Sequence, residues 1–236
     1  MHTSPVAAAH PEAHDNPALL HHFATAEQQK DAASFGMWLF LVTEVMFFGG
    51  MFCAYLVYRY WYFGDFGAAS QSLDIRLGAL NTVVLICSSL TVALAVRCAQ
   101  IGKQKSIVIY LLLTIVLGLA FLGVKAVEYK SKFDENHIPG QAGFHLAGHI
   151  PSHPDIPVNQ AHAQVYFSLY FAMTGMHALH MIIGVGLFAF LTYKAWQGRY
   201  TSDYYTPVEN AGLYWHFVDI VWIYLFPLLY LIDRHK

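Results

Sequence analysis

Charged residues are scarce in this chain of 236 residues. Only 12% of them are Asp, Glu, Lys or Arg, whereas 56% are hydrophobic and 16% are aromatic. Soluble domains average about a quarter charged residues, so this composition falls outside the soluble range. The net charge of −2 leaves no excess of positive charge, and we therefore expect no nucleic-acid partner.

Cysteine is also rare, with Cys53, Cys87 and Cys98 alone in the chain and none of them in a CxxC motif. Each lies within or at the end of an apolar stretch, which predicts small buried side chains rather than a disulfide framework. A glycine-rich phosphate loop, a CxxCH haem-attachment motif and a cleavable signal peptide are likewise missing. A catalytic site confined to this chain is therefore not expected.

The chain instead contains five long runs that are nearly free of charge. A bilayer core requires about 20 mostly apolar residues in a helix, because hydrocarbon offers the backbone amides no other partner. Glu44 interrupts the first run and Asp219 the last; the other three are uninterrupted. The runs are Phe35–Tyr58, Leu77–Val96, Ser106–Val124, Ala163–Tyr193 and Asn210–Ile232. They predict an all-α integral membrane bundle of five transmembrane helices, at about 33-62, 75-98, 105-130, 162-196 and 207-233.

Two segments outside these helices are rich in histidine. One is a polar tail, 1-30, and the other is a loop, 131-161, that is also rich in Pro and Gly. Pro151 and Pro154 prevent a long helix in the loop. Its histidines favour two interpretations, a solvated segment that contacts a partner and a zinc or copper site. They are His137, His145, His149, His153 and, at the edge, His162.

Glu44 is the first ionisable group that the pattern places within the membrane. Such groups are costly in lipid and are therefore candidates for function. Two interpretations remain open, a titrating functional carboxyl and a neutral carboxyl that holds a neighbouring helix by a hydrogen bond. The aromatic and apolar neighbours on its helical face are Phe40, Phe47, Phe48 and Met51.

The fourth and fifth predicted helices carry the other intramembrane polar groups. His177 and His180 are three residues apart and share a helix face. Glu209 and His216 are seven apart and align along another face, with Asp219 one turn further on. We predict that these groups face one another in a buried polar network that ties the two helices together. The alternative is a haem or metal site built from the three histidines.

Trp215 and Glu128 complete the predicted polar network. Trp215 precedes His216 and has an indole N–H that requires a partner when buried. Glu128 lies at the end of the third predicted helix, where the simpler interpretation is an ion pair with Lys125 or Lys132 at the membrane interface.

One family shares the motifs of all five predicted helices. The segments that carry the resemblance are, in chain order, SFGMWLFLVTEVMFF, LNTVVLICSSLTV, GLAFLGVKAVEY, YFSLYFAMTGMHALHMIIGVG and VENAGLYWHFVDIVWIYLF. Over residues 34–232 the chain resembles subunit III of cytochrome c oxidase, a haem-copper oxidase. It resembles the shorter bacterial form, with five helices where mitochondrial members have seven.

The resemblance implies a subunit without redox chemistry of its own. Family members bind no haem or copper and pack on subunits I and II, which hold these cofactors and reduce oxygen to water with proton translocation. Structural phospholipid and support of proton uptake are implied too. We expect cytochrome c as donor to the complex, and a respiratory supercomplex is a further candidate partner. Glu44 matches the family carboxyl known for reacting with carbodiimide. The other matching positions are Glu128, His177, His180, Glu209, His216, Asp219 and Trp215.

The implied location is the bacterial plasma (inner) membrane, with the N-terminus cytoplasmic and the C-terminus and long loop external. The basic connections at 97–105 and 194–208 favour the same orientation, because cytoplasmic loops are enriched in Lys and Arg. Three alternatives stay open: a subunit III of a quinol oxidase or a homologue associated with nitric oxide reductase, an independent ion transporter, and a membrane cytochrome with haem on His177, His180 or His216.

Overall fold

The structure is a computed structural model that describes residues 23–141, 143–151, 153–202 and 204–232. Within this part of the chain, five of the helices are long and apolar enough to cross a membrane, which confirms the predicted all-α bundle of five spans. Most of the predicted tail at 1-30, with its histidines, lies outside the described residues. The elements, in order, are α1 (Ala26–Trp61), α2 (Phe63–Gln71), α3 (Ile75–Gln100), α4 (Gln104–Asp134), β1 (His149–Ile150), β2 (His153–Pro157), α5 (Gln160–Trp196) and α6 (Thr206–Tyr230).

The helix boundaries differ from the predicted ones for local reasons. Helix α1 begins at Ala26, well before residue 33, because the Thr25 side chain accepts a hydrogen bond from the Gln28 backbone N–H and caps the helix. Helix α4 continues past the predicted end at 130 to Asp134, because the charged side chains of its last turns have partners of their own. Glycines with positive φ, Gly102 and Gly198, follow the ends of α3 and α5.

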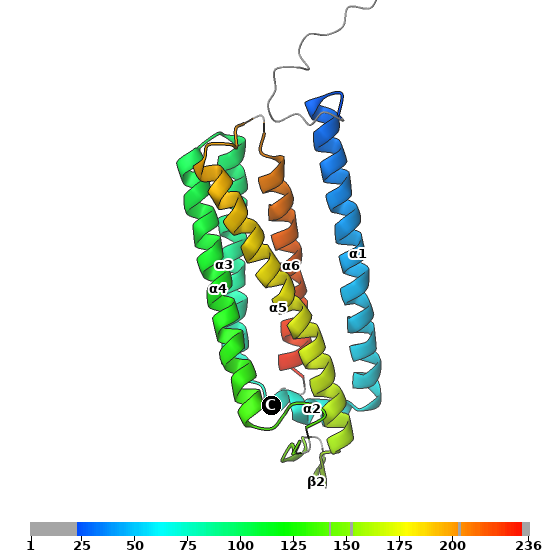
Figure 1. Cartoon of the computed structure of the whole chain (residues 1–236). Helices are drawn as coiled ribbons and strands as arrows, with labels where there is room; N and C mark the ends of the chain where they lie inside the picture. Colours follow the sequence, from blue (N-terminus) through cyan, green and yellow to red (C-terminus); the bar gives the residue numbers. More distant parts are fainter. Residues whose placement is uncertain (1–22, 142, 152, 203, 233–236) are drawn as a thin grey trace, which may run out of the picture.

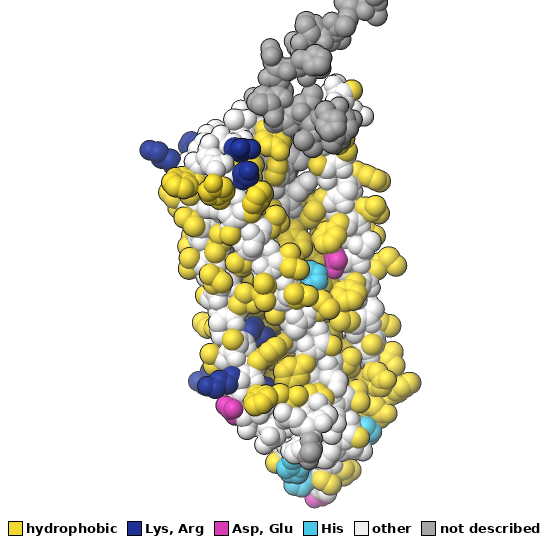
Figure 2. Space-filling model, in the orientation of Figure 1, with side chains coloured by type: hydrophobic (Ala, Val, Ile, Leu, Met, Phe, Trp, Pro, Cys, Tyr) yellow, Lys and Arg dark blue, Asp and Glu magenta, His cyan; other side chains and the backbone are white. Residues whose placement is uncertain are grey.

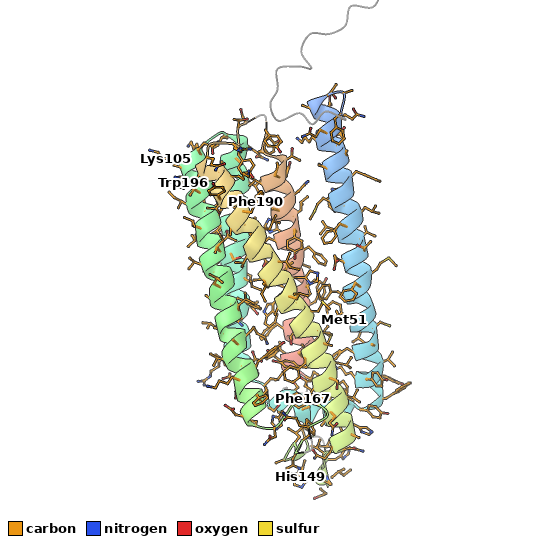
Figure 3. The ribbon with its side chains drawn as sticks, in the orientation of Figure 1. Met51, Lys105, His149, Phe167, Phe190 and Trp196 are labelled. Atoms are coloured by element: carbon orange, nitrogen blue, oxygen red, sulfur yellow. The ribbon has the colours of Figure 1, made fainter. Side chains whose placement is uncertain are left out.

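Helices α3, α4, α5 and α6 form a compact group, and α1 stands at its side (Figure 1). Helix α6 packs against α3, α5 and α1, while α3 and α4 form an antiparallel pair. The ends of the bundle can be followed in Figure 3, where Lys105 and Trp196 lie at one end and His149 at the other. The two short strands pair antiparallel at the end with His149, close to α2.

Helix α2 is a short element that the hydropathy pattern did not predict. It occupies the connection at 63–75 and anchors the long loop. Asp65 accepts a hydrogen bond from the Asn159 backbone N–H at 2.9 Å, and its other oxygen lies 2.6 Å from Nδ1 of His162. The His162 ring stacks on Tyr62, with 3.7 Å between ring centroids. These contacts fix the start of α5 against the end of α1.

The end of α6 is held by side chains from three other elements. The hydroxyl of Tyr55 donates to the Leu228 carbonyl at 2.5 Å. Ser70 and Tyr166 both donate to the Leu229 carbonyl, at 2.8 and 2.7 Å. Carbonyls in the last turn of a helix have no partner within the helix, and lipid provides none. The bundle therefore closes around this end of α6.

The exterior of the bundle is apolar, as Figure 2 shows for one face. The predicted burial of the three cysteines is wrong, because Cys53 and Cys87 are exposed on this apolar exterior and Cys98 is only partly buried. In a membrane protein a small apolar side chain gains little by facing another helix rather than lipid, so an apolar run does not distinguish the two.

Close packing of α5 on α6 depends on Gly184. A Cβ atom added at Gly184 would lie 2.8 Å from Cζ3 of the Trp215 ring, whereas one added at Gly186, one half-turn away, would meet nothing within 4 Å. We expect Gly184→Ala to destabilise the folded chain by about 1–3 kcal/mol, the usual effect of overpacking. Gly186→Ala is the matched control and should be neutral or slightly stabilising, because Ala favours helix over Gly. If the two substitutions changed the resistance to proteolysis in detergent equally, this packing would be contradicted.

Candidate functional site

Glu44 on α1 pairs with His180 on α5. One carboxyl oxygen of Glu44 lies 3.1 Å from Nε2 of His180, and the two side chains are 18% and 11% exposed. The Phe48 ring packs edge-on against the imidazole at 5.3 Å. Figure 2 shows a histidine beside an acidic side chain halfway along the bundle, among hydrophobic side chains. An ionisable pair thus borders the lipid-facing surface at mid-membrane.

The other nitrogen of His180 determines how many protons this pair holds. Nδ1 lies 2.9 Å from the Met176 carbonyl, which only accepts hydrogen bonds, so Nδ1 carries a proton. Nε2 and the Glu44 carboxyl then share one proton between them. The pair is either a neutral acid with a neutral imidazole or a carboxylate with an imidazolium. Both forms have zero net charge, which makes the pair tolerable within hydrocarbon.

His216 and Asp219 form a second group, with Ser89 of α3. The Ser89 hydroxyl lies 2.7 Å from Nδ1 of His216. Asp219 is 2% exposed, and neither of its carboxyl oxygens has a hydrogen-bond partner among the described residues, although Ser89 lies close by. This group faces α3 and has no bond to the Glu44–His180 pair in the described part of the chain.

Lys125 and Glu128 form a third group with two tyrosines, Tyr170 and Tyr230. The Lys125 ammonium lies 3.0 Å from Oε2 of Glu128. It also donates to the hydroxyls of Tyr170 and Tyr230, at 3.2 and 3.0 Å. Both tyrosines in turn donate to Oε1 of Glu128. The predicted pairing with Lys125 is present, but both charges are buried rather than placed at the interface. A closed polar box thus links α4, α5 and α6.

The remaining predicted residues lie apart from these groups. His177 is 1% exposed between the rings of Phe121 and Trp222, and neither ring nitrogen has a hydrogen-bond partner among the described residues. Trp215 is fully buried and donates its indole N–H to Ser88 at 2.6 Å. Glu209 lies in the first turn of α6, at the end of the bundle near Lys30. The predicted residues thus form separate clusters rather than one network.

The comparisons with known proteins point to one family. The family profile described as "Cytochrome c oxidase subunit III" matches residues 18–137 and 158–233. The chain belongs to this family. A similar protein from Cyprinus carpio, "Cytochrome c oxidase subunit 3", is 33% identical over 202 residues, which cover 83% of this chain and 68% of the relative. The protein of the same name from Thermostichus vulcanus is 28% identical over 210 residues, covering 89% of this chain and 92% of the relative.

Membership of the cytochrome c oxidase subunit III family makes this chain a multi-pass membrane protein and part of a complex with other oxidase subunits. The names of the relatives favour cytochrome c oxidase over the alternative of a quinol oxidase or a homologue associated with nitric oxide reductase. The independent transporter and the free-standing membrane cytochrome are likewise not favoured.

Several residues of this subunit III site were not predicted from the sequence. Lys125 was predicted only as one of two partners for Glu128, and Tyr170, Tyr230 and Ser89 were not predicted at all. The spacing of three between Lys125 and Glu128 is a recognisable signal for a pair on one helix. The tyrosines offered no such signal, because they come from α5 and α6 and meet Glu128 only in the packed bundle.

The histidines of the predicted loop at 131-161 take separate positions. The His137 ring stacks on Phe167 of α5, with 5.2 Å between centroids, and its Nδ1 lies 3.0 Å from a Glu135 oxygen. Burial and the nearby Lys132 ammonium lower the pKa of His137 despite the Glu135 carboxylate, which favours the neutral ring. Within the described residues, no three His, Cys, Asp or Glu side chains converge as metal ligands would.

Proposed function

We propose that this chain is the accessory, non-catalytic subunit III of a cytochrome c oxidase, an enzyme that reduces oxygen to water and translocates protons. It lies in the bacterial inner membrane with its N-terminus in the cytoplasm, and its C-terminus and long loop are external. Subunits I and II hold the haem and copper, cytochrome c donates electrons to the complex, and this chain binds neither cofactor. Assembly of the oxidase into a respiratory supercomplex is part of the same proposal.

The observation that carries this proposal is how the intramembrane polar groups of this family member are paired with one another. Glu44 is paired with His180, and Lys125 with Glu128, so the charges of each pair are balanced within the bundle. Such groups can hold a proton or bind a helix in place. None of them provides, within the described residues, the cluster of ligands that a redox metal requires. Support of a partner's chemistry suits this arrangement better than chemistry of its own.

Structural phospholipid is the ligand that the surface beside Glu44 suits best. A shallow groove of about 310 Å³ lies between α1, α5 and α6, with an almost wholly apolar lining. Tyr214 lines it and donates its hydroxyl to the His180 carbonyl at 2.9 Å. An acyl chain seated there would lie next to the Glu44–His180 pair and shield it from other lipid. The groove lining includes Met37, Phe40, Ile183, Leu187, Asn210 and Tyr214.

Two substitutions of Glu44 separate a proton-carrying role from a packing role. In Glu44→Gln the amide can still donate to Nε2 of His180, so the helix contact persists while the titratable carboxyl is lost. In Glu44→Ala both are lost. For a carboxyl that supports proton uptake, we expect both variants to assemble and to shorten the lifetime of the oxidase during turnover several-fold.

The measurement is oxygen consumption by the purified complex, followed until activity decays, together with the rate of proton uptake. Loss of lifetime in Glu44→Ala alone would assign Glu44 a packing role. Unchanged assembly, proton uptake and lifetime in both variants would remove any functional role for Glu44.

A further inference from the structure

A groove of about 550 Å³ runs along the outside of the bundle between α4 and α5, and its lining is almost wholly apolar. Thr192 lines it but donates its hydroxyl to the Phe188 carbonyl at 2.7 Å, so this hydroxyl needs no partner from an occupant. The groove is distinct from the one beside Glu44, which lies between α1, α5 and α6. The side chains that form its two walls include Val108, Leu112 and Ile115 from α4 and Thr192, Tyr193 and Trp196 from α5.

The groove opens at the end of the bundle where α4 begins and α5 ends. Two contacts set the antiparallel register of these helices. The Tyr129 hydroxyl lies 2.5 Å from the Thr174 hydroxyl, and a Cβ atom added at Gly118 would lie 3.1 Å from the Val185 side chain. Continued toward the start of α4, this register brings position 105 level with the last turn of α5. Figure 3 shows Lys105 and Trp196 at this same end.

The depth of the groove matches one leaflet of a bilayer. From Lys105 to Ile115 helix α4 rises by about 15 Å, at about 1.5 Å per residue. The hydrocarbon core of a bilayer is about 30 Å thick, so one leaflet contributes about 15 Å. Tyr193 and Trp196 are 53% and 77% exposed beside the open end. Exposed aromatic rings of this kind are typical of the headgroup level.

Lys105 places a positive charge at the open end of the groove. It precedes Val108 by three residues and Leu112 by seven, so the three side chains share one face of α4. Lys105 is exposed, and no ion pair is formed by it within the described part of the chain. A long Lys side chain at a helix end can lay its methylenes on an apolar surface and hold its ammonium at the headgroups.

The surroundings of Lys105 are also positive. The first turn of α4 contains no acid and no side chain caps it, so its first backbone N–H groups add to the positive potential. Asp31 and Glu209, two acids of the same end, lie instead near Lys30 of α1. Figure 2 shows several Lys and Arg side chains at this end of the bundle. The basic residues of the two connections there are Arg97, Lys103, Lys105, Lys194 and Arg199.

From these observations we propose that the groove between α4 and α5 is a binding site for a phospholipid of net negative charge. Its phosphate lies against the Lys105 ammonium, and one acyl chain lies along the groove as far as Ile115. Basic pockets between membrane helices bind anionic headgroups in this way. The Trp196 indole N–H is a further donor for the headgroup or its ester oxygens. The inference goes beyond the proposed function, because it requires only that the chain spans a membrane.

Photoreactive lipids test the site directly. Phosphatidylglycerol and phosphatidylcholine, each with the same diazirine-bearing acyl chain, are added to the protein as it purifies from its membranes in mild detergent. After irradiation, the labelled peptides of this chain are identified by mass spectrometry. On the peptides that contain residues 108–115 and 189–196, we expect at least about fivefold more label from the anionic lipid than from the zwitterionic one.

Two substitutions at basic residues test the charge. Lys105→Gln should reduce the label from phosphatidylglycerol to the level of phosphatidylcholine. Lys194→Gln is the matched control, because it removes the same charge at the same end of the bundle. The Lys194 ammonium lies over the Phe190 ring at 5.4 Å, and neither residue lines the groove. This variant should therefore keep the preference for the anionic lipid.

Two further substitutions test the groove itself. Leu112→Trp places a larger ring in the groove and should lower the label from both lipids several-fold. Leu113→Trp is the control, since Leu113 is similarly exposed, 43% against 49% for Leu112, but does not line the groove. Leu113→Trp should leave the labelling unchanged.

Three results would overturn the inference. Equal label from the two lipids would mean ordinary boundary lipid without a preference for charge. An equal loss in Lys105→Gln and Lys194→Gln would mean a general attraction to the basic end. Groove peptides without label from either lipid would mean that a polypeptide covers the groove. None of these results bears on the proposed function, which is tested separately by the oxidase polypeptides that co-purify.

Discussion

Replacing Lys125 by Met is expected to destabilise the folded chain by about 3–5 kcal/mol, because one partner of a buried ion pair is removed. Glu128 would be left with only the hydroxyls of Tyr170 and Tyr230 as hydrogen-bond partners in this box. The stability of this chain can be measured by proteolysis at increasing SDS, with detection by an antibody to the chain. Lys105→Met, an exposed position at the start of the same helix, is the control and should change stability by less than about 0.5 kcal/mol.

A double substitution separates the charge from the packing. Lys125→Met combined with Glu128→Gln removes both charges, and the amide oxygen still accepts hydrogen bonds from the tyrosines. The double variant should therefore be more stable than Lys125→Met alone, because no unpaired charge remains. A double variant whose loss equals the sum of the two single losses would show that the two charges do not stabilise each other.

Trp215→Ala is the second substitution from which we expect a large effect. The Trp215 ring is fully buried, packs against Gly118, Gly184 and Phe188, and donates to Ser88. Truncating a buried Trp in a soluble core costs about 3–5 kcal/mol. This cost is smaller in a membrane, because an exposed ring in the unpacked bundle meets hydrocarbon rather than water. We therefore expect Trp215→Ala to lower the free energy of unfolding by about 2–3 kcal/mol through the lost packing and hydrogen bond.

The same SDS-dependent proteolysis measures the Trp215 effect. Trp196→Ala is the matched control, because that ring is 77% exposed at the end of α5. Trp215→Phe should lie between the two, since it keeps a ring but loses the hydrogen bond to Ser88. If Trp215→Ala and Trp196→Ala had the same stability, the close contact of α5 with α6 through Gly184 would be disproved.

The spans could be predicted from the sequence because one physical requirement dominates them. Backbone amides in hydrocarbon must bond within a helix, so length and the absence of charge suffice to find the membrane helices. The ends are less predictable. Helix α1 starts at Ala26 because of a single side-chain cap at Thr25, and α4 extends beyond 130 to Asp134, where Lys132 pairs with Glu135.

The types of the site residues could be predicted, but not their partners. An ionisable group within a span is costly wherever it lies, so Glu44, His180 and Asp219 are recognisable in the sequence alone. Which groups meet depends on how the helices rotate about their axes. That rotation is set by contacts such as Gly184 against Trp215, far from the polar groups themselves. The periodicity of a single helix contains no information about it.

The three polar groups differ in what they offer a larger complex. The Lys125–Glu128 box is closed, since each of its charged atoms already has a partner within the bundle. The Glu44–His180 pair is balanced but borders the lipid-facing surface. Asp219 is the one of these groups whose oxygens lack partners among the described residues. The first group therefore has no charged atom left to offer a partner, whereas the second is the group that the proposed support of proton uptake requires.

The measurement that tests the central claim most directly is purification of this chain from its own membranes in mild detergent. The purified material is analysed by mass spectrometry and by its reduced-minus-oxidised absorption spectrum. We expect the chain in equal amounts with oxidase polypeptides that hold haem and copper, and no haem absorption from the chain once it is separated from them. A chain that purifies alone, or one that keeps haem after separation, would contradict the account.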